Sequence, residues 1–152
     1  KSIRIMSPYF LPDNILLGAL ATAARRGVTV DIIIPAQNNL AIVSHAMAAQ
    51  FDQILKDGSR IFRAKGPFDH SKLMTVDGHW AFVGSSNLDS RSLRLNFEID
   101  LEVLDPAVCA AIDARIEQSL EGGEPVTLEE LRLRPFVFRL FDRVFWLGSP
   151  YL

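Results

Sequence analysis

A histidine and a lysine two residues apart, followed by a serine and an asparagine two residues apart, carry the clearest chemical potential in this chain. His70 and Lys72 begin a stretch with the pattern of a strand, so alternation would place the imidazole and the ammonium on one face of a sheet. Ser85 and Asn87 follow the next predicted strand, where a hydroxyl and an amide can bind oxygen atoms. Beside Lys72, these groups would form a cradle for a phosphate group.

A carboxylate on the following predicted strand, Glu98, could hold one nitrogen of the imidazole and leave the other free. A histidine held in this way is a competent nucleophile or general acid near neutral pH. Taken singly, His70 could be a structural residue and Lys72 a solvated charge. Ser85 and Asn87 could form turns, and Glu98 could protect an edge strand. The joint spacing favours the catalytic interpretation over these separate ones.

The first part of the chain predicts the sheet that would carry these residues. Residues 3–10, 28–34 and 59–64 have strand patterns, with helical patterns between them. The run 28–34 is apolar and β-branched almost throughout, which is typical of a strand buried on both faces of a parallel sheet. This alternation of strands and helices predicts an α/β sheet with right-handed crossovers.

Start signals mark three helices. Residues 12–14 precede the first helical pattern, Asn38 or Asn39 can cap the second, and Asp105 with Pro106 begins the third. The starting points of these helices are therefore predicted independently of their apolar periodicity.

The middle of the chain changes from crossovers to a hairpin. Strands are predicted at 70–76 and 80–84, separated by Asp77 and Gly78, a pair that is a strong signal for a tight turn. A further strand is predicted at 96–104. The expected fold class is α/β, with a mixed, largely parallel sheet flanked by helices and an apolar helical tail at the C-terminus.

Composition divides the chain into two regions. Residues 1–123 would form the catalytic domain, and residues 124–152 an apolar helical tail. In a helix over 136–147, two arginines and Asp142 would share a narrow polar arc, leaving apolar side chains around most of the circumference. Such a helix must be covered, either by the rest of a larger protein or by a membrane interface, where basic residues beside aromatic ones suit anionic head groups.

The spacing of the motif resembles that of a known superfamily. The pattern His-x-Lys-x4-Asp-x6-Gly-Ser-x-Asn, with an acid thirteen residues after the serine, is similar to the signature of the phospholipase D superfamily. The segments 7–13, 87–98 and 149–152 resemble, more narrowly, the C-terminal half of bacterial cardiolipin synthases. The residues that match the signature are His70, Lys72, Asp77, Gly84, Ser85, Asn87 and Glu98.

The resemblance implies an active site assembled from two such motifs, one from each half of the protein or from each of two subunits. One histidine would attack phosphorus to give a phosphohistidine, and the other would protonate the departing alcohol. His70 would be the general acid and later the base, with Glu98 orienting it. Lys72 and Asn87 would hold the phosphate oxygens, assisted by Ser85. Asp77 and Gly84 would be structural, and no metal or cofactor is implied.

For a cardiolipin synthase, the acceptor would be the hydroxyl of a second phosphatidylglycerol, so the implied partners are a phospholipid, a membrane surface and a second motif domain. The implied location is the bacterial cell membrane, and the resemblance does not specify the cytoplasmic or the periplasmic face. The chain begins within an apparent strand and without methionine, so we expect it to be a piece of a longer protein. No run of 18 uncharged apolar residues is present.

Two other functions remain open at this point. A homodimer of the chain could complete the site and act as a phosphodiesterase or nuclease. The net charge of −2 and pI near 5.9 make a nucleic-acid partner less favourable, because polyanion binding relies on excess positive charge. The domain could alternatively retain the motif without turnover and serve as a docking module.

Overall fold

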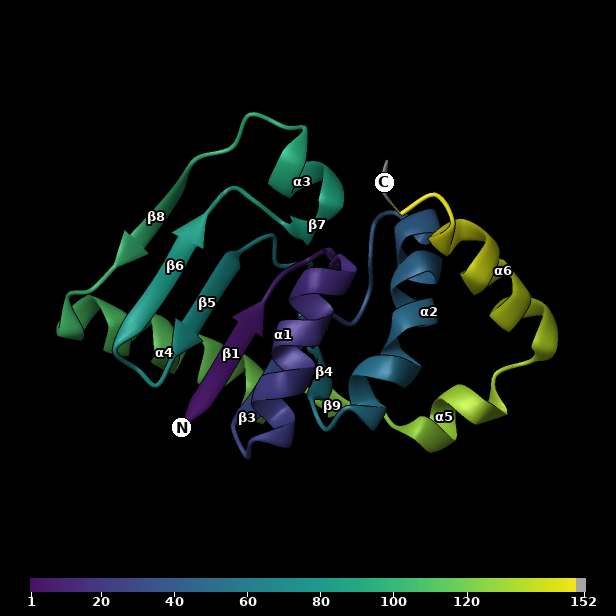
Figure 1. The fold of residues 1–152 in the computed structure, drawn as a ribbon, viewed down its shortest axis with the longest axis horizontal. Helices are drawn as coiled ribbons and strands as arrows, with labels where there is room; N and C mark the ends of the chain where they lie inside the picture. The colour runs from purple at the N-terminus through teal and green to yellow at the C-terminus, as the bar shows by residue number, and fades with distance from the viewer. Residues whose placement is uncertain (150–152) are drawn as a thin grey trace.

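The computed structural model describes residues 1–149, in which a mixed seven-stranded sheet carries helices on both faces. Helix α1 lies over one face and α4 over the opposite one, while α2, α5 and α6 gather beyond the β4 side (Figure 1). The strand order is β8-β6-β5-β1-β3-β4-β9.

In chain order the elements are β1 (Ser2–Met6), β2 (Phe10–Leu11), α1 (Asn14–Arg25), β3 (Thr29–Pro35), α2 (Ala41–Lys56), β4 (Arg60–Ala64), β5 (Lys72–Val76), β6 (Trp80–Gly84), β7 (Leu88–Asp89), α3 (Ser90–Arg94), β8 (Asp100–Val103), α4 (Pro106–Glu121), β9 (Glu124–Pro125), α5 (Leu128–Leu133) and α6 (Phe136–Trp146).

The predicted α/β class, with a mixed sheet flanked by helices, is confirmed. Its parallel part is the centre, where β1, β3 and β4 run in one direction, and β5, β6, β8 and β9 join by antiparallel pairing. The apolar run of β3 is buried on both faces, as its composition predicts. Ile32 packs into the larger core beneath α1 and α2, and Ile33 into a smaller one beneath α4.

The predicted helix starts hold for two of the three helices. Asp13 caps α1 by accepting hydrogen bonds from the backbone of the first turn, and Asp105 caps α4 in the same way. The prediction for the second helix is wrong, because Leu40 occupies the N-cap position of α2 and provides no side-chain hydrogen bond. Asn38 instead accepts from the Leu40 backbone N–H at 3.0 Å, which forms a turn ahead of the helix.

Three strands are shorter than the sequence pattern predicts. The strand predicted at 3–10 ends at Met6, and Phe10 belongs to β2, which lies in a separate two-stranded sheet. The other two corrections concern site residues. β5 begins at Lys72, so His70 precedes the strand, in a turn where Asp69 accepts from the Ser71 N–H at 2.9 Å. β8 begins at Asp100, so Glu98 also lies before its strand. β6 ends at Gly84, which pairs with Lys72 on one side and with Asp100 on the other. Because no residue of β6 follows Gly84, the pairing that defines β5 and β8 cannot extend to His70 or Glu98.

Several short elements escaped the sequence patterns because a few residues display no periodicity. The parallel pair β2 and β7 joins the segment after β1 to the segment after the Ser-x-Asn motif. Helix α3 follows β7 directly, and α5 precedes α6. Strand β9 pairs with the edge of β4, so the chain after α4 returns to the sheet.

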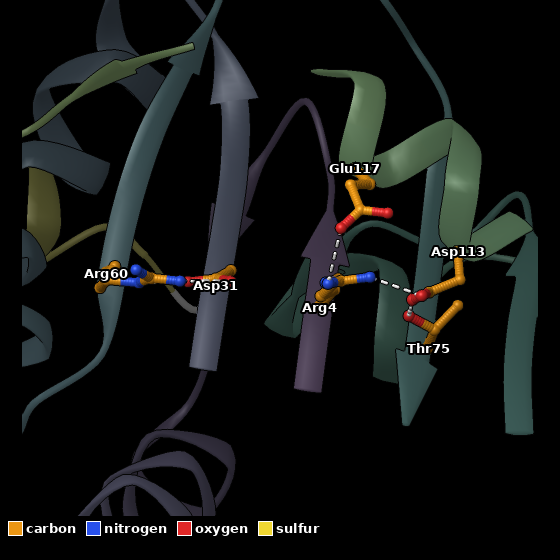
Figure 2. A network of polar contacts seen from close by, with 6 residues as sticks. All are labelled: Arg4, Asp31, Arg60, Thr75, Asp113 and Glu117. Carbon is orange, nitrogen blue, oxygen red and sulfur yellow. Dashed lines mark hydrogen bonds and ion pairs between the residues drawn. The ribbon is translucent and has the colours of Figure 1, made fainter. Parts of the chain in front are cut away.

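Polar contacts fix α4 against its face of the sheet (Figure 2). Arg4, on β1, donates to Asp113 of α4 at 2.5 Å, and Thr75, on β5, donates to the other oxygen of the same carboxylate at 2.6 Å. A second pair, Asp31 with Arg60, links β3 to β4 through two hydrogen bonds of 2.6 and 2.9 Å. The strands that carry the site and the helix behind them are therefore joined by directional contacts as well as by packing.

Helix α6 packs along α2 with its acidic residue buried and most of its apolar side chains exposed. Its Asp142 is 4% exposed and faces α2, where His45 Nδ1 lies 2.6 Å from the carboxylate. Arg134 donates to the same carboxylate at 3.0 Å. The opposite side of the helix and the residue that follows it present exposed apolar side chains: Phe136, Val137, Leu140, Phe141, Val144 and Leu147. None of the helices within residues 1–149 is both long and apolar enough to cross a membrane.

Candidate active site

Except for Asp77, the residues of the motif meet at one end of the sheet, although they come from three separate segments. Lys72 begins β5, Gly84 ends β6 and Asp100 begins β8, and these three residues are paired side by side. His70 therefore lies just before one strand, Ser85 and Asn87 just after the next, and Glu98 just before the third.

His70 and Lys72 are in direct contact. The Lys72 ammonium lies 2.8 Å from His70 Nδ1 and donates to the His70 carbonyl oxygen at 2.7 Å. Lys72 itself is only 5% exposed, whereas His70 is exposed. The predicted juxtaposition is confirmed, but it arises from a turn that folds His70 back over Lys72 and not from strand alternation.

The pKa values of both residues are lowered. Partial desolvation and then the charge of Lys72 lower the pKa of His70, while the Asp69 carboxylate acts in the opposite direction. Burial lowers the pKa of Lys72, against the raising effects of Glu98, Asp89 and Asp69. The imidazole is thus biased toward its neutral form and accepts a hydrogen bond from the ammonium.

Replacing Lys72 with methionine is expected to raise the pKa of His70, because the change removes a positive charge while keeping an unbranched side chain in the buried position. Titrating the histidine ring signals by NMR would measure the shift. Lys56→Met is the matched control, since Lys56 lies on α2 and pairs with Asp52. An unchanged His70 midpoint in Lys72→Met would contradict the electrostatic coupling.

Glu98 is bound to Ser85 and Asn96. Its carboxylate accepts from the Ser85 hydroxyl and from the Asn96 amide, the latter at 3.2 Å. The Ser85 hydroxyl in turn accepts from the Ile99 N–H at 3.0 Å. Within residues 1–149 no hydrogen bond joins Glu98 to His70, so the orienting role of Glu98 stays a prediction.

The loop between Ser85 and Asn87 is held by a contact that the sequence did not reveal. Ser86 is buried, and both its N–H, at 3.1 Å, and its hydroxyl donate to Asp100. Gly84 lies so close to this carboxylate that a Cβ there would stand 2.0 Å from its Oδ1. A glycine at position 84 is therefore required for Asp100 to bind Ser86.

Asn87 has an unused polar atom. Its Nδ2 donates to the Ser92 hydroxyl at 3.3 Å, whereas its buried Oδ1 has no partner within the described part of the chain. Because a hydroxyl can donate or accept, turning the amide over would keep the bond to Ser92 and free the N–H groups. Asn87 lines a cavity of about 170 Å³ together with Tyr9.

Aromatic rings that the sequence did not identify as site residues surround His70. Tyr9 meets the imidazole edge-on with 5.9 Å between ring centroids, and the Phe68 centroid lies at 5.7 Å. The Tyr9 hydroxyl donates to Asn39 at 2.5 Å. Tyr9 belongs to the segment 7–13, which resembled cardiolipin synthases, and that similarity was the only available signal for its position.

The remaining motif residue and the other histidines lie away from this end of the sheet. Asp77 occupies the hairpin turn with φ of 55° and accepts from the Ser2 N–H at 2.7 Å, which ties the turn to the start of β1. His79 follows the same turn, and His45 lies on α2. Among residues 1–149 no three His, Cys, Asp or Glu side chains are grouped to hold a metal ion.

Comparison with known proteins gives a consistent result. The family described as "Cardiolipin synthase, PLD-like domain" matches residues 1–120. Cardiolipin synthase A of Proteus mirabilis is 40% identical over 154 residues, and that of Yersinia pseudotuberculosis serotype O:1b is 39% identical over 152 residues. The chain is covered completely in both matches and spans about 31% of the length of each relative.

Solved structures share the fold. Nuc from Salmonella typhimurium, a phospholipase D family member, superimposes with a TM-score of 0.70 at 24% identity, covering 83% of this chain and 82% of Nuc. Phosphatidylserine synthase from Haemophilus influenzae gives a TM-score of 0.75 at 18% identity, covering 100% of this chain and 42% of that protein.

Proposed function

Because this chain belongs to the cardiolipin synthase, PLD-like domain family, we propose that it supplies one of two half-sites of a phosphatidyltransferase that makes cardiolipin from phosphatidylglycerol. The observation that carries the proposal is the meeting of His70, Lys72, Ser85 and Asn87 at one end of the sheet. The acceptor would be the head-group hydroxyl of a second phosphatidylglycerol, and free glycerol would be the other product.

In the proposed reaction, the phosphate of the lipid enters the space beside Lys72. The ammonium turns from His70 Nδ1 to a non-bridging oxygen, and the amide of Asn87 donates to another. Ser85 assists once its hydroxyl turns from Glu98 to the phosphate. The charge of Lys72 is held beside His70 before substrate arrives, and a preorganised charge of this kind stabilises a transition state.

Substrate binding would also prepare His70 for proton transfer. In the free site, the neighbouring ammonium holds the pKa of the imidazole down. A phosphate bound between the two residues brings negative charge and engages Lys72, so both changes raise the pKa of His70. His70 could then give a proton to the departing glycerol oxygen and later take one from the attacking hydroxyl, as a general acid and base.

The second half-site must supply the nucleophile, since one imidazole cannot attack phosphorus and protonate the leaving group on its opposite side. A row of exposed apolar residues around Glu98 offers a surface that a second motif domain would cover. Phe97, beside Glu98, is fully exposed, and the other members of the row are Leu95, Ile99 and Leu101. Covering this row would also keep water from the phosphohistidine, which favours transfer over hydrolysis.

The exposed apolar side of α6 is proposed to face the membrane that holds the substrate. Arg139 and Arg143 border this side on the same helix and are exposed, as suits an anionic head-group layer. The C-terminal region of the chain would thus associate with the bacterial cell membrane, and residues 1–123 would present the site to lipid. Alternatively, another part of the full-length protein covers the apolar side of α6.

The proposal is tested by comparing the full-length protein with the 152-residue chain on two substrates. We expect the full-length protein to convert phosphatidylglycerol in vesicles to cardiolipin, and the chain alone to produce less than about 1% as much, because it lacks the second histidine. Thin-layer chromatography of radiolabelled lipid would measure both. Cleavage of single-stranded DNA without cardiolipin formation would favour the homodimeric phosphodiesterase or nuclease instead.

A further inference from the structure

A cavity of about 210 Å³ lies among α2, α5 and α6, and its lining residues include none of the motif. These helices gather beyond the β4 side of the sheet, whereas the site around His70 lies at the ends of β5, β6 and β8 (Figure 1). The short side chains of Ala48 and Ala49, on α2, form part of the wall. The volume is that of about seven water molecules in the liquid, which suits one small ionic group and not a whole lipid.

The wall of this cavity carries an excess of positive charge. Its cations are Lys56, Arg132, Arg134, Arg139 and Arg143, and its anions are Asp52 and Asp142. Five positive charges against two negative ones leave an excess of three, in a chain whose net charge is −2. A concave surface lined by one sign of charge attracts ligands of the opposite sign, so the cavity favours an anion.

The two carboxylates of the wall are each bound by a cation of the wall. Asp52 pairs with Lys56 at 2.6 Å, and Asp142 pairs with Arg134 at 3.0 Å. The other three arginines have exposed side chains, and they make no ion pair or side-chain hydrogen bond within residues 1–149. Because a guanidinium group is a planar fork of donors that matches phosphate oxygens, the excess charge resides on groups well suited to phosphate.

Arg134 also has hydrogen-bonding capacity that the protein does not use. Its Nη2 donates to both oxygens of Asp142, at 3.1 and 3.0 Å. Its Nε–H is buried and has no acceptor in the described part of the chain. An unpaired buried donor costs free energy, and an anion held in the cavity would offer acceptor oxygens to this guanidinium group.

The exposed apolar side of α6 adjoins the cavity. Arg139 and Arg143 are one turn apart, and side chains three or four residues apart on a helix are neighbours. Phe136 lies three residues before Arg139, and Leu147 lies four residues after Arg143; both apolar side chains are 74% exposed. A ligand with a phosphate group and long apolar chains can therefore contact the arginines and the apolar side together, whereas a free phosphate ion can contact only the arginines.

We propose that this cavity is a second lipid site, which takes the phosphate group of an anionic phospholipid while the acyl chains lie along the apolar side of α6. The inference rests on the proposed membrane orientation of α6 and not on the reaction chemistry. It goes beyond a general attraction to the head-group layer, because a cavity of this size takes one phosphate and becomes saturated. Since the site lies apart from His70, the lipid bound there is not the one that reacts. It holds the domain on the membrane while substrate lipids enter and leave.

The experiment titrates the full-length protein with short-chain phospholipids in a neutral detergent and follows the bound molecules by native mass spectrometry. The probes are dioctanoyl phosphatidic acid, dioctanoyl phosphatidylcholine and inorganic phosphate. The main variant combines Arg139→Gln with Arg143→Gln, and Arg132→Gln tests the wall on α5 separately. The matched control combines Arg25→Gln with Arg26→Gln, which removes two charges from exposed positions at the end of α1.

We expect the main variant to bind phosphatidic acid about thirtyfold more weakly at one site, as for the loss of two contacts between a cation and a lipid phosphate. Arg132→Gln should weaken the same site about fivefold, and the control should match the wild type. In the wild type, phosphatidylcholine and inorganic phosphate should bind this site at least about tenfold more weakly than phosphatidic acid, because the first has no net charge and the second has no acyl chains. Thermal unfolding of each variant verifies folding.

Two results would overturn the inference. One is binding of phosphatidic acid that is equal in the wild type, the main variant and Arg132→Gln, which would favour cover of α6 by another part of the protein. The other is binding of inorganic phosphate as tight as that of phosphatidic acid, which would exclude the apolar side of α6 from the site. A wild-type protein that binds phosphatidic acid as expected but makes no cardiolipin would overturn the proposed function and support this inference.

Discussion

Replacing His70 with alanine in the full-length protein is expected to lower cardiolipin formation by about 10²–10⁴-fold, the usual contribution of a general acid or base. The imidazole is the one ring nitrogen base at this end of the sheet in the described part of the chain, and it touches Lys72 directly. Without it, the glycerol that departs in the proposed reaction would have to leave unprotonated. Because His70 is exposed and precedes β5, its loss should leave the fold intact.

The matched control is His79→Ala, which removes an exposed imidazole beside the hairpin turn at the far end of β5. Its activity should equal that of the wild type, and both variants should unfold at the wild-type temperature. Unaltered activity in His70→Ala would mean that this half does not take part in turnover. The docking-module function considered from the sequence would then be favoured.

Gly84→Ala is expected to impair both stability and activity, although it adds a single methyl group. That methyl would stand 2.0 Å from Asp100 Oδ1 and 2.7 Å from the Ile99 carbonyl oxygen, which is closer than real Cβ contacts. Overpacking of this kind costs about 1–3 kcal/mol. The backbone shift would also release Ser86 from Asp100, so the Ser85–Asn87 cradle should move and cardiolipin formation should fall at least about tenfold.

Gly18→Ala makes the same chemical change at a position where a Cβ meets nothing within 4 Å. Gly18 lies in the interior of α1 and is exposed, so alanine there should stabilise the protein by about 0.5–1 kcal/mol. Denaturant unfolding of both variants measures the contrast. A Gly84→Ala protein as stable and active as the wild type would contradict the assigned function of the glycine.

The features predicted correctly from the sequence are those that depend on residues close together in the chain. The Asp77-Gly78 turn follows from two residues that tolerate positive φ, at 55° and 69°, and it fixes how β5 pairs with β6. The buried centre of β3 follows from its β-branched run, and the starts of α1 and α4 follow from single aspartate caps. Local chemistry is sufficient in each case.

Contacts between distant residues account for what the sequence could not provide. The bond from Ser85 to Glu98 and the bonds from Ser86 to Asp100 depend on how β6 and β8 align, which no local pattern encodes. Tyr9, just ahead of the β2–β7 pair, meets His70 although the two residues are far apart in the chain. The positions of His70 and Glu98 outside their strands likewise depend on the end of β6 at Gly84, where its pairing with β5 and β8 stops.

The buried Asp142 has a consequence for the way α6 is seated. A helix with apolar side chains on nearly every side could roll about its own axis on α2 and find comparable packing at several angles. The carboxylate permits one angle only, because every other one would withdraw it from His45 and Arg134 and leave their polar groups unmatched. A charge that adds little to the free energy of folding can thus set the rotational register of the helix, and with it the set of phenylalanines that points outward.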